Sequence, residues 1–172
     1  MSNRYTTIRR EQREITAYHE AAHAVFYVAY MESFRYVTIR GHGEVLGQVH
    51  GGGRRRRRLD ILLPICLAGP CAEQLFLMRR GEASTFYEDT LMELPDCDPV
   101  DLDGDWAKVY DIAEKQGWFG AKLARLSEDV IEDVFEWWPQ ITTLAEALLS
   151  SPRALTYREV CDLVGSIPEN AA

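Results

Sequence analysis

The motif His19-Glu20-Ala21-Ala22-His23 constrains this chain more than any other feature, because it lies within a long run of helix-forming residues. From Arg9 to Glu32 there is no glycine or proline, and apolar residues recur at the spacing of one helix face. Residues four apart on a helix lie one turn above each other, so the two imidazoles can bind a single metal ion. The sequence therefore predicts a metal-binding helix over this range.

The chemistry of the motif favours zinc. Two neutral imidazoles suit zinc and leave room for a third protein ligand and a water molecule. Glu20 directly follows the first histidine, which places its carboxylate beside the attacking water, where it can act as a general base. The motif predicts a zinc-dependent hydrolase. The alternative is a chance spacing of His19 and His23, two of only four histidines, on an ordinary helix.

Length and composition limit the fold and the partners. With 172 residues, 47% of them hydrophobic, the chain is expected to form one domain over residues 1–172. The net charge of -8 argues against a nucleic-acid partner, because binding phosphates requires a basic face. The run Arg54 to Arg58 is interpreted as a solvated loop or helix start, with phosphate or anionic lipid binding as the alternative.

The cysteine pattern and the most apolar segment predict a cytoplasmic protein. There is no C-x-x-C spacing and no secretory signal pattern at the N-terminus. The most apolar segment, Ile61 to Met78, contains Pro64, Pro70 and Glu73. We therefore expect a buried core helix there rather than a membrane span.

The remaining pattern predicts a mainly α fold with a small β-hairpin or sheet, an α+β class with a C-terminal helical bundle. Strands are expected at 35–40 and 45–50. Helices are expected at 57–79, kinked or divided by its two prolines, at 105–115, and in two or three pieces over 121–165, the last with Thr156 and Glu159 as a capping box. An acidic loop over 81–100 and a tail over 167–172 complete the prediction.

Two polar features of the chain, Glu73 and a group of aspartates, need a structural explanation. Glu73 lies in an apolar segment, so its carboxylate is expected to accept from the second ring nitrogen of a metal-binding histidine or to pair with an arginine. Small residues beside it, beginning at Gly69, would let another helix approach closely. Five aspartates between Asp96 and Asp105 fail the spacing of a calcium loop, so we interpret one of them as the start of the next helix.

Taken together, these segments resemble the peptidase domain of the FtsH family, the membrane-anchored ATP-dependent zinc proteases. Residues 19–24 are similar to the family's H-E-A-G-H-A. Residues 37–41 with Leu46-Gly47 resemble V-T-I-x-P-R-G followed by L-G-Y, and residues 67–75 resemble L-x-G-G-R-A-A-E-E-L. Residues 144–148 and 155–160 are similar to its closing helices. The resemblance implies a zincin-like helix within a single peptidase domain.

The resemblance also implies a third zinc ligand and a role for Glu73. The family's ligand is an aspartate in N-D-x-x-x-A-T-x-x-A, and Asp105 matches it rather than Asp101 or Asp103, because Ala113 follows at the same offset. Glu73 is then expected to orient a ligand. The chain departs from the family at Ala22, Gly104 and Val109, has a longer acidic loop before the third ligand, and lacks the ATPase module and membrane helices.

The sequence thus predicts a soluble zinc metalloprotease that is ATP-independent by itself. Zinc held by His19, His23 and Asp105 would act with Glu20 on unfolded polypeptides, peptides or a dedicated partner, with a separate ATPase or unfoldase as a candidate partner. The substrate is expected to lie along a strand edge formed by Val45, Leu46, Gly47, Gln48 and Val49. The alternative is a binding or regulatory domain that keeps the fold without turnover. Cleavage of a transcription repressor ranks last, because no DNA-binding helix pair is present.

Overall fold

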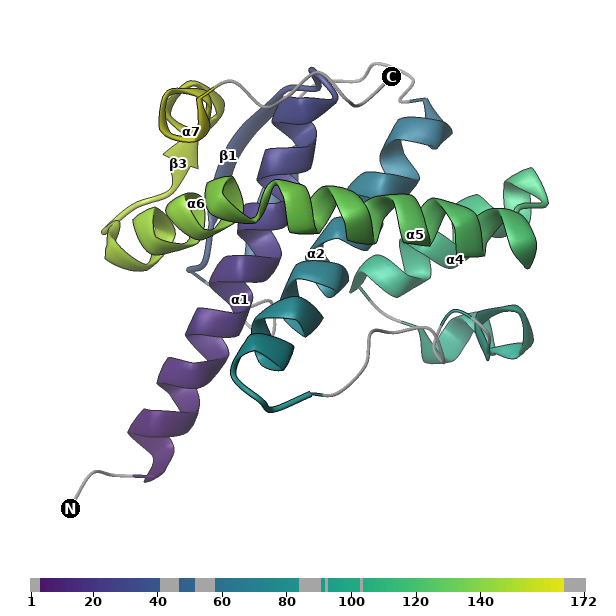
Figure 1. Ribbon diagram of the computed structural model, residues 1–172, viewed down its shortest axis with the longest axis horizontal. Coiled ribbons are helices and arrows are strands. Elements are labelled where there is room, and N and C mark those ends of the chain that lie inside the picture. The colour runs from purple at the N-terminus through teal and green to yellow at the C-terminus, as the bar shows by residue number, and fades with distance from the viewer. Residues whose placement is uncertain are drawn as a thin grey trace.

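A computed structural model describes residues 4–40, 47–51, 58–83, 91, 93–102 and 104–165, with only the backbone for residues 4–10. Its described part is mainly helical with one small antiparallel sheet, which confirms the predicted fold class (Figure 1). In chain order the elements are α1 (Arg4–Ala29), β1 (Phe34–Thr38), β2 (Gln48–Gly51), α2 (Leu59–Arg79), two single-turn 3-10 helices (Leu94–Asp96 and Pro99–Asp101), α4 (Gly104–Gln116), α5 (Ala121–Glu136), α6 (Trp138–Ser150), β3 (Leu155–Thr156) and α7 (Tyr157–Val164).

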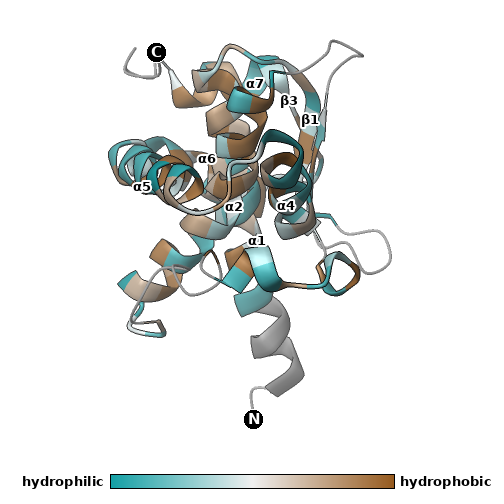
Figure 2. Ribbon diagram, turned by 90° about the vertical axis from the view of Figure 1, so that its right-hand side faces the viewer, coloured by the Kyte–Doolittle hydropathy of each residue, from teal (hydrophilic) through white to brown (hydrophobic). Residues whose placement is uncertain are grey.

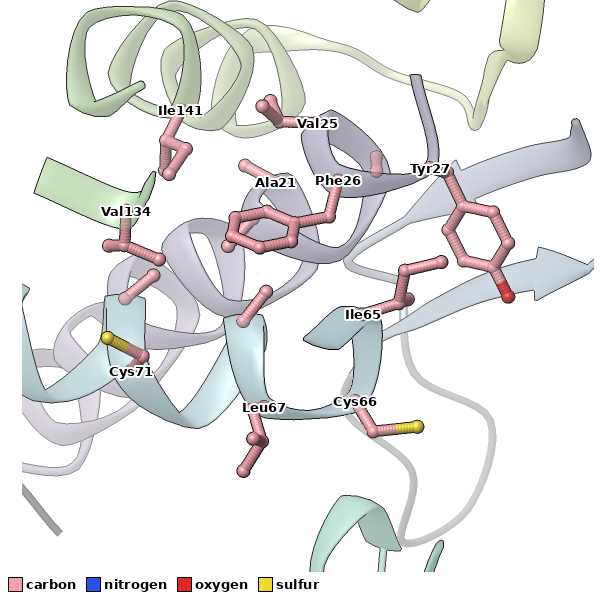
Figure 3. Packing of buried hydrophobic residues seen from close by; sticks show 14 of the residues in the cluster. Ala21, Val25, Phe26, Tyr27, Ile65, Cys66, Leu67, Cys71, Val134 and Ile141 are labelled. Atoms are coloured by element: carbon pink, nitrogen blue, oxygen red, sulfur yellow. The ribbon is translucent and has the colours of Figure 1, made fainter. Parts of the chain in front are cut away.

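Helices α1 and α2 form the centre of the fold. They make the most extensive contact between any two elements, and α6 packs across α1 (Figure 1). Alanines on the inner face of α1, including Ala17 and Ala21, are fully buried and allow the two helices to approach closely. Beside them, Phe26 makes an edge-to-face contact with Trp137, at a ring distance of 4.8 Å. Figure 3 shows Phe26 and Val25 pointing from α1 toward Val134 and Ile141.

Helix α2 runs unbroken from Leu59 to Arg79, through Pro64 and Pro70. Of the two predicted outcomes, division of the helix is therefore wrong, whereas a kink at the prolines stays a prediction. Each proline removes one backbone donor, which by itself costs about 3 kcal/mol. Eleven residues of α2, including both prolines, are buried, and the helix packs against α1, α4 and α5. The free energy gained by this burial outweighs the cost of the lost hydrogen bonds.

The length and composition of α2 also match those of a membrane span. The helix has 21 residues and a mean hydropathy of 1.7 in its most apolar window. In the described fold, 61% of that window is buried inside the protein, as in the core helix of a globular domain. The absence of a membrane span stays a prediction.

The C-terminal region consists of three helices. The buried residues of α5 lie on one face, and Figure 2 shows hydrophilic residues on its outer side. Trp137 and Trp138 at the junction of α5 and α6 are 0% and 9% exposed, so both belong to the core. The predicted capping box is present at the start of α7, where Thr156 and Glu159 each accept from the other's backbone N–H.

The sheet has the strand order β2-β1-β3, and both pairs are antiparallel. The predicted hairpin of β1 and β2 is present, with Thr38 opposite Gln48. The short strand β3 was not predicted. It pairs Leu155 and Thr156 with β1 directly before α7, and two residues are too few to show a strand pattern.

The segment predicted as an acidic loop is partly helical. Residues 94–96 and 99–101 form the two 3-10 helices, while residues 84–90 and 92 lie outside the described part. Leu94 is fully buried in the main core and ties this segment to the fold. Asp98 caps the second 3-10 helix by accepting from the Val100 N–H, which explains one of the aspartates in structural terms.

Candidate metal centre

Three side chains from two helices converge at the centre of the fold. Asp105 Oδ2, in the first turn of α4, lies 2.9 Å from Nε2 of His19 and 2.9 Å from Nε2 of His23, both on α1. The two Nε2 atoms are 3.1 Å apart. All three side chains are largely buried, with 21%, 9% and 12% exposure for His19, His23 and Asp105. This trio forms a potential metal-binding group.

The other ring nitrogen of each histidine faces an oxygen acceptor. His19 Nδ1 lies 3.2 Å from Glu73 Oε2, and His23 Nδ1 lies 2.6 Å from the backbone carbonyl oxygen of Ile65. A carbonyl or carboxylate oxygen only accepts, so Nδ1 of both rings donates. In the neutral rings the Nε2 atoms then carry lone pairs directed at Asp105. Such anchoring is typical of metal-binding histidines.

The spacing of the three facing atoms fits a small metal ion. Ligand atoms about 2.0–2.1 Å from a tetrahedral ion are about 3.3 Å from one another. The distances of 2.9, 2.9 and 3.1 Å are within a few tenths of an ångström of that value. Two lone pairs and a carboxylate oxygen this close together repel one another unless a proton or a metal ion lies among them. The residues present therefore fit a metal ion with two nitrogen ligands and one oxygen ligand.

Protonation of the site shows the same preference for a cation. Burial lowers the pKa of His19, but hydrogen bonds to Asp105 and Glu73 outweigh that effect and raise it to about 10. Burial alone would raise the pKa of Asp105, yet the neighbouring His23 and His19 hold it well below its usual range. The two carboxylates thus favour a positive charge on the facing His19 ring.

Glu20 is buried beside this trio. Its side chain is on the same helix as both histidines and is 7% exposed. Burial raises the pKa of Glu20, although the two histidines act in the opposite direction. A carboxylate with a raised pKa accepts a proton at neutral pH more readily than an exposed one. Glu20 therefore has the environment of a general base.

At two positions beside the site, only glycine can be accommodated. A Cβ atom at Gly69 on α2 would stand 2.7 Å from His19 Nε2 and would also collide with the ring of His23. A Cβ atom at Gly47, directly before β2, would stand 2.7 Å from Glu20 Cγ and 2.9 Å from Glu20 Oε1. All of these separations are shorter than non-bonded contacts allow. Glycine is therefore required where α2 and the sheet approach the site.

The predicted substrate edge is only partly described. Val45 and Leu46 lie outside the described residues, whereas Gly47, Gln48 and Val49 are at the start of the outer strand β2. Within the described part, β2 pairs with β1 on one side only. A pocket of about 500 Å³ adjoins this end of the strand, between Gly47 and Gln48 and the loop at 152–154.

No family model matches the chain, and no curated protein matches it. The resemblance to the FtsH peptidase domain stays a prediction, and the candidate site rests on its own geometry.

The structure separates the predicted site residues from the alternatives. Asp105 joins His19 and His23, whereas Asp101 lies in a 3-10 helix outside the cluster and Asp103 is outside the described residues. Of the two remaining histidines, His50 stacks on Tyr36 in the sheet and His42 is not described. From the arginine run, Arg58 precedes α2 and pairs with Asp60, while residues 54–57 are not described.

Sequence reasoning missed two contributors to the site, the Ile65 carbonyl and Lys108, and it missed the contacts that two glycines make there. The Ile65 carbonyl is a backbone group, so no residue type indicates it. Gly69 was expected to allow close approach of another helix and Gly47 to lie on the substrate edge, but their contacts with the site depend on how the elements pack. Lys108, whose ammonium group lies 2.8 Å from Asp105 Oδ1, follows Asp105 at the i,i+3 spacing of a helical ion pair, and that spacing was the available signal.

Proposed function

We propose that this chain is a zinc-dependent metallopeptidase domain that cleaves extended polypeptide. The observation that carries the proposal is the convergence of His19 Nε2, His23 Nε2 and Asp105 Oδ2, each ring being fixed from behind by an oxygen acceptor. A structural zinc site is usually closed by four protein ligands, whereas a catalytic site has three. Within the described residues the group has three members.

In this proposal, the residues around the centre have different roles in peptide hydrolysis. His19, His23 and Asp105 would hold the ion, and Glu73 and the Ile65 carbonyl keep the two imidazoles oriented. When bound, zinc supplies Lewis-acid polarisation of the scissile carbonyl and lowers the pKa of water. Glu20 accepts the proton of the attacking water and delivers it to the leaving amine. Its burial, which raises its pKa, suits it to both transfers.

The substrate in this proposal is an extended segment added to the outer side of β2. Backbone hydrogen bonds to a strand edge recognise any extended peptide, so they favour unfolded or flexible substrates over a single sequence. The lack of a side chain at Gly47 lets this edge lie directly against Glu20. We include the resemblance to the FtsH peptidase domain in this proposal, with a separate unfoldase as the partner that would deliver folded substrates.

The test combines metal analysis with proteolysis. Elemental analysis of the purified chain is expected to give one zinc per chain, and an unstructured protein such as casein is expected to be cut without ATP. A chelator should stop the cleavage and added zinc should restore it. Zinc at one per chain without cleavage of casein or other unfolded substrates would favour the alternative of a binding domain. A chain that takes up no zinc contradicts the proposal.

A further inference from the structure

The two oxygens of the Asp105 carboxylate have different partners. Oδ2 faces the two histidine nitrogens, at 2.9 Å from each. Oδ1 accepts a charged hydrogen bond of 2.8 Å from the ammonium group of Lys108. The carboxylate is therefore held from both sides, with one oxygen toward the centre and the other toward a fixed positive charge.

Helix geometry explains why Lys108 reaches this oxygen. Lys108 follows Asp105 by three residues on α4, and long helical side chains lean toward the N-terminus of their helix. The lysine side chain is 61% exposed, whereas that of Asp105 is 12% exposed. The ammonium group thus reaches from the rim of the site to a carboxylate that is almost buried. Burial lowers the pKa of Lys108, but the charge and hydrogen bond of Asp105 outweigh this and raise it.

This contact differs from an ordinary surface ion pair. Exposed pairs contribute about 0–1 kcal/mol, because water competes for both charges. The comparable pair on the same helix, Lys115 with Asp111, has both side chains more than half exposed. Asp105 is shielded from water, and the charge of Glu20 also acts on Lys108. The ammonium group therefore belongs electrostatically to the site and not only to the helix surface.

The contact has a consequence for how Asp105 can act as a ligand. A carboxylate binds zinc through one oxygen or through both, at about 2.0–2.2 Å. An ammonium group on Oδ1 occupies that oxygen and repels a second cation from it. Asp105 then offers Oδ2 alone. Two imidazoles and one oxygen leave a fourth position for water or substrate, whereas a carboxylate using both oxygens would crowd that position and make the ion five-coordinate when water is bound.

We propose that Lys108 is a positioning residue, which holds Oδ1 of Asp105 so that the carboxylate gives a metal ion a single oxygen and leaves the site open. This inference rests on the proposed metal site. It adds a second function to α4, which supplies the ligand and also the group that restricts it. The aspartate ligand and the lysine that restricts it would lie within one turn of α4.

The experiment uses the full chain loaded with cobalt(II), whose visible absorption is strong in four-coordinate sites and weaker in five-coordinate sites. Wild type is expected to give the strong four-coordinate spectrum. Lys108→Met should bind one cobalt per chain but give the weaker spectrum, and Lys108→Arg should restore the strong one. The matched control is Lys115→Met, which breaks the exposed ion pair on the same helix and should leave the spectrum unchanged.

Activity and folding give two further readouts. The kcat/KM for casein is expected to fall about 10- to 100-fold in Lys108→Met, the range found for groups that orient metal ligands. The thermal unfolding of its metal-free form should match that of Lys115→Met. A cobalt spectrum of Lys108→Met identical to that of wild type overturns the inference while leaving the zinc site in place. Failure of wild type to bind cobalt or zinc overturns the proposed function itself, and the inference with it.

Discussion

Gly69 of α2 lies directly against His19 of α1, so that a Cβ atom at Gly69 would stand 2.7 Å from the Nε2 atom of the histidine. Helix α2 therefore forms one side of the candidate metal centre. The same helix supplies Glu73 and the Ile65 carbonyl, which hold the outer nitrogens of the two imidazoles. One helix thus sets both the space available to the two rings and their orientation.

The first prediction follows from this contact. Gly69→Ala forces the two imidazoles away from their positions, so zinc affinity should fall at least about tenfold, as for loss of other groups that orient metal ligands. Helix propensity alone would make this substitution stabilising by about 0.5–1 kcal/mol, whereas overpacking costs about 1–3 kcal/mol. Competition with a coloured chelator and urea unfolding of the metal-free protein measure the two effects. A more stable variant with unchanged zinc affinity would contradict the steric role of Gly69.

Much of the fold follows from local sequence patterns, and the exceptions have physical causes. Helices α1 and α4 were predicted from apolar spacing and from their ends, since the relevant interactions are local. Helix α2 continues through its two prolines because tertiary packing outweighs the free-energy cost of the lost backbone hydrogen bonds. No local sequence window contains that packing. Strand β3 is stabilised by pairing with β1, a partner more than 100 residues away.

The candidate site also has one part that the sequence indicates and one part that depends on tertiary packing. His19, Glu20 and His23 are visible as a motif because one helix holds all three, and Asp105 was assigned through a family resemblance. The structure brings Asp105 to the two histidines from a separate helix. The contacts made by Gly47, Gly69 and the Ile65 carbonyl are steric or involve the backbone. They depend on how the helices pack, so a single sequence indicates them weakly.

The second prediction concerns the third ligand and removal of the metal. Zinc that binds only the folded state raises its stability, by about 2.7 kcal/mol at a free concentration one hundred times the Kd. Thermal unfolding of wild type should therefore shift upward with zinc and return with chelator. Asp105→Asn should abolish the shift, because a neutral amide is a poor ligand for zinc. Asp111→Asn on the same helix is the control, and should keep the full shift; a zinc-dependent shift of equal size in Asp105→Asn would rule out Asp105 as a ligand.

The third prediction concerns the pH dependence of stability, away from the metal centre. Burial, together with Glu136, Asp129 and Glu132, raises the pKa of Asp133 on α5 to about 6. The unfolded chain has an aspartate pKa of about 3.9, so between about pH 4 and 6 the folded state holds more protons. This carboxyl therefore makes stability fall as pH rises through that window.

Replacement of Asp133 should remove this loss. Asp133→Asn is expected to be about 1 kcal/mol more stable than wild type at pH 7, after allowance for solvent screening of a half-buried group, and equal to it near pH 4. Urea unfolding at the two pH values measures the difference. Asp162→Asn, on α7 outside this cluster, should give no such pH-dependent gain. Equal stability of Asp133→Asn and wild type at pH 7 would show that the ionised carboxyl is not destabilising.

The central claim is that Glu20 transfers protons at a zinc site held by other residues. The most direct test is casein cleavage by zinc-loaded Glu20→Gln, beside wild type and the control Glu11→Gln, which makes the same change at an exposed position of α1. We predict one zinc per chain in all three proteins, cleavage by wild type and Glu11→Gln, and a loss of at least about 100-fold in kcat for Glu20→Gln. Full activity of zinc-loaded Glu20→Gln would contradict the account.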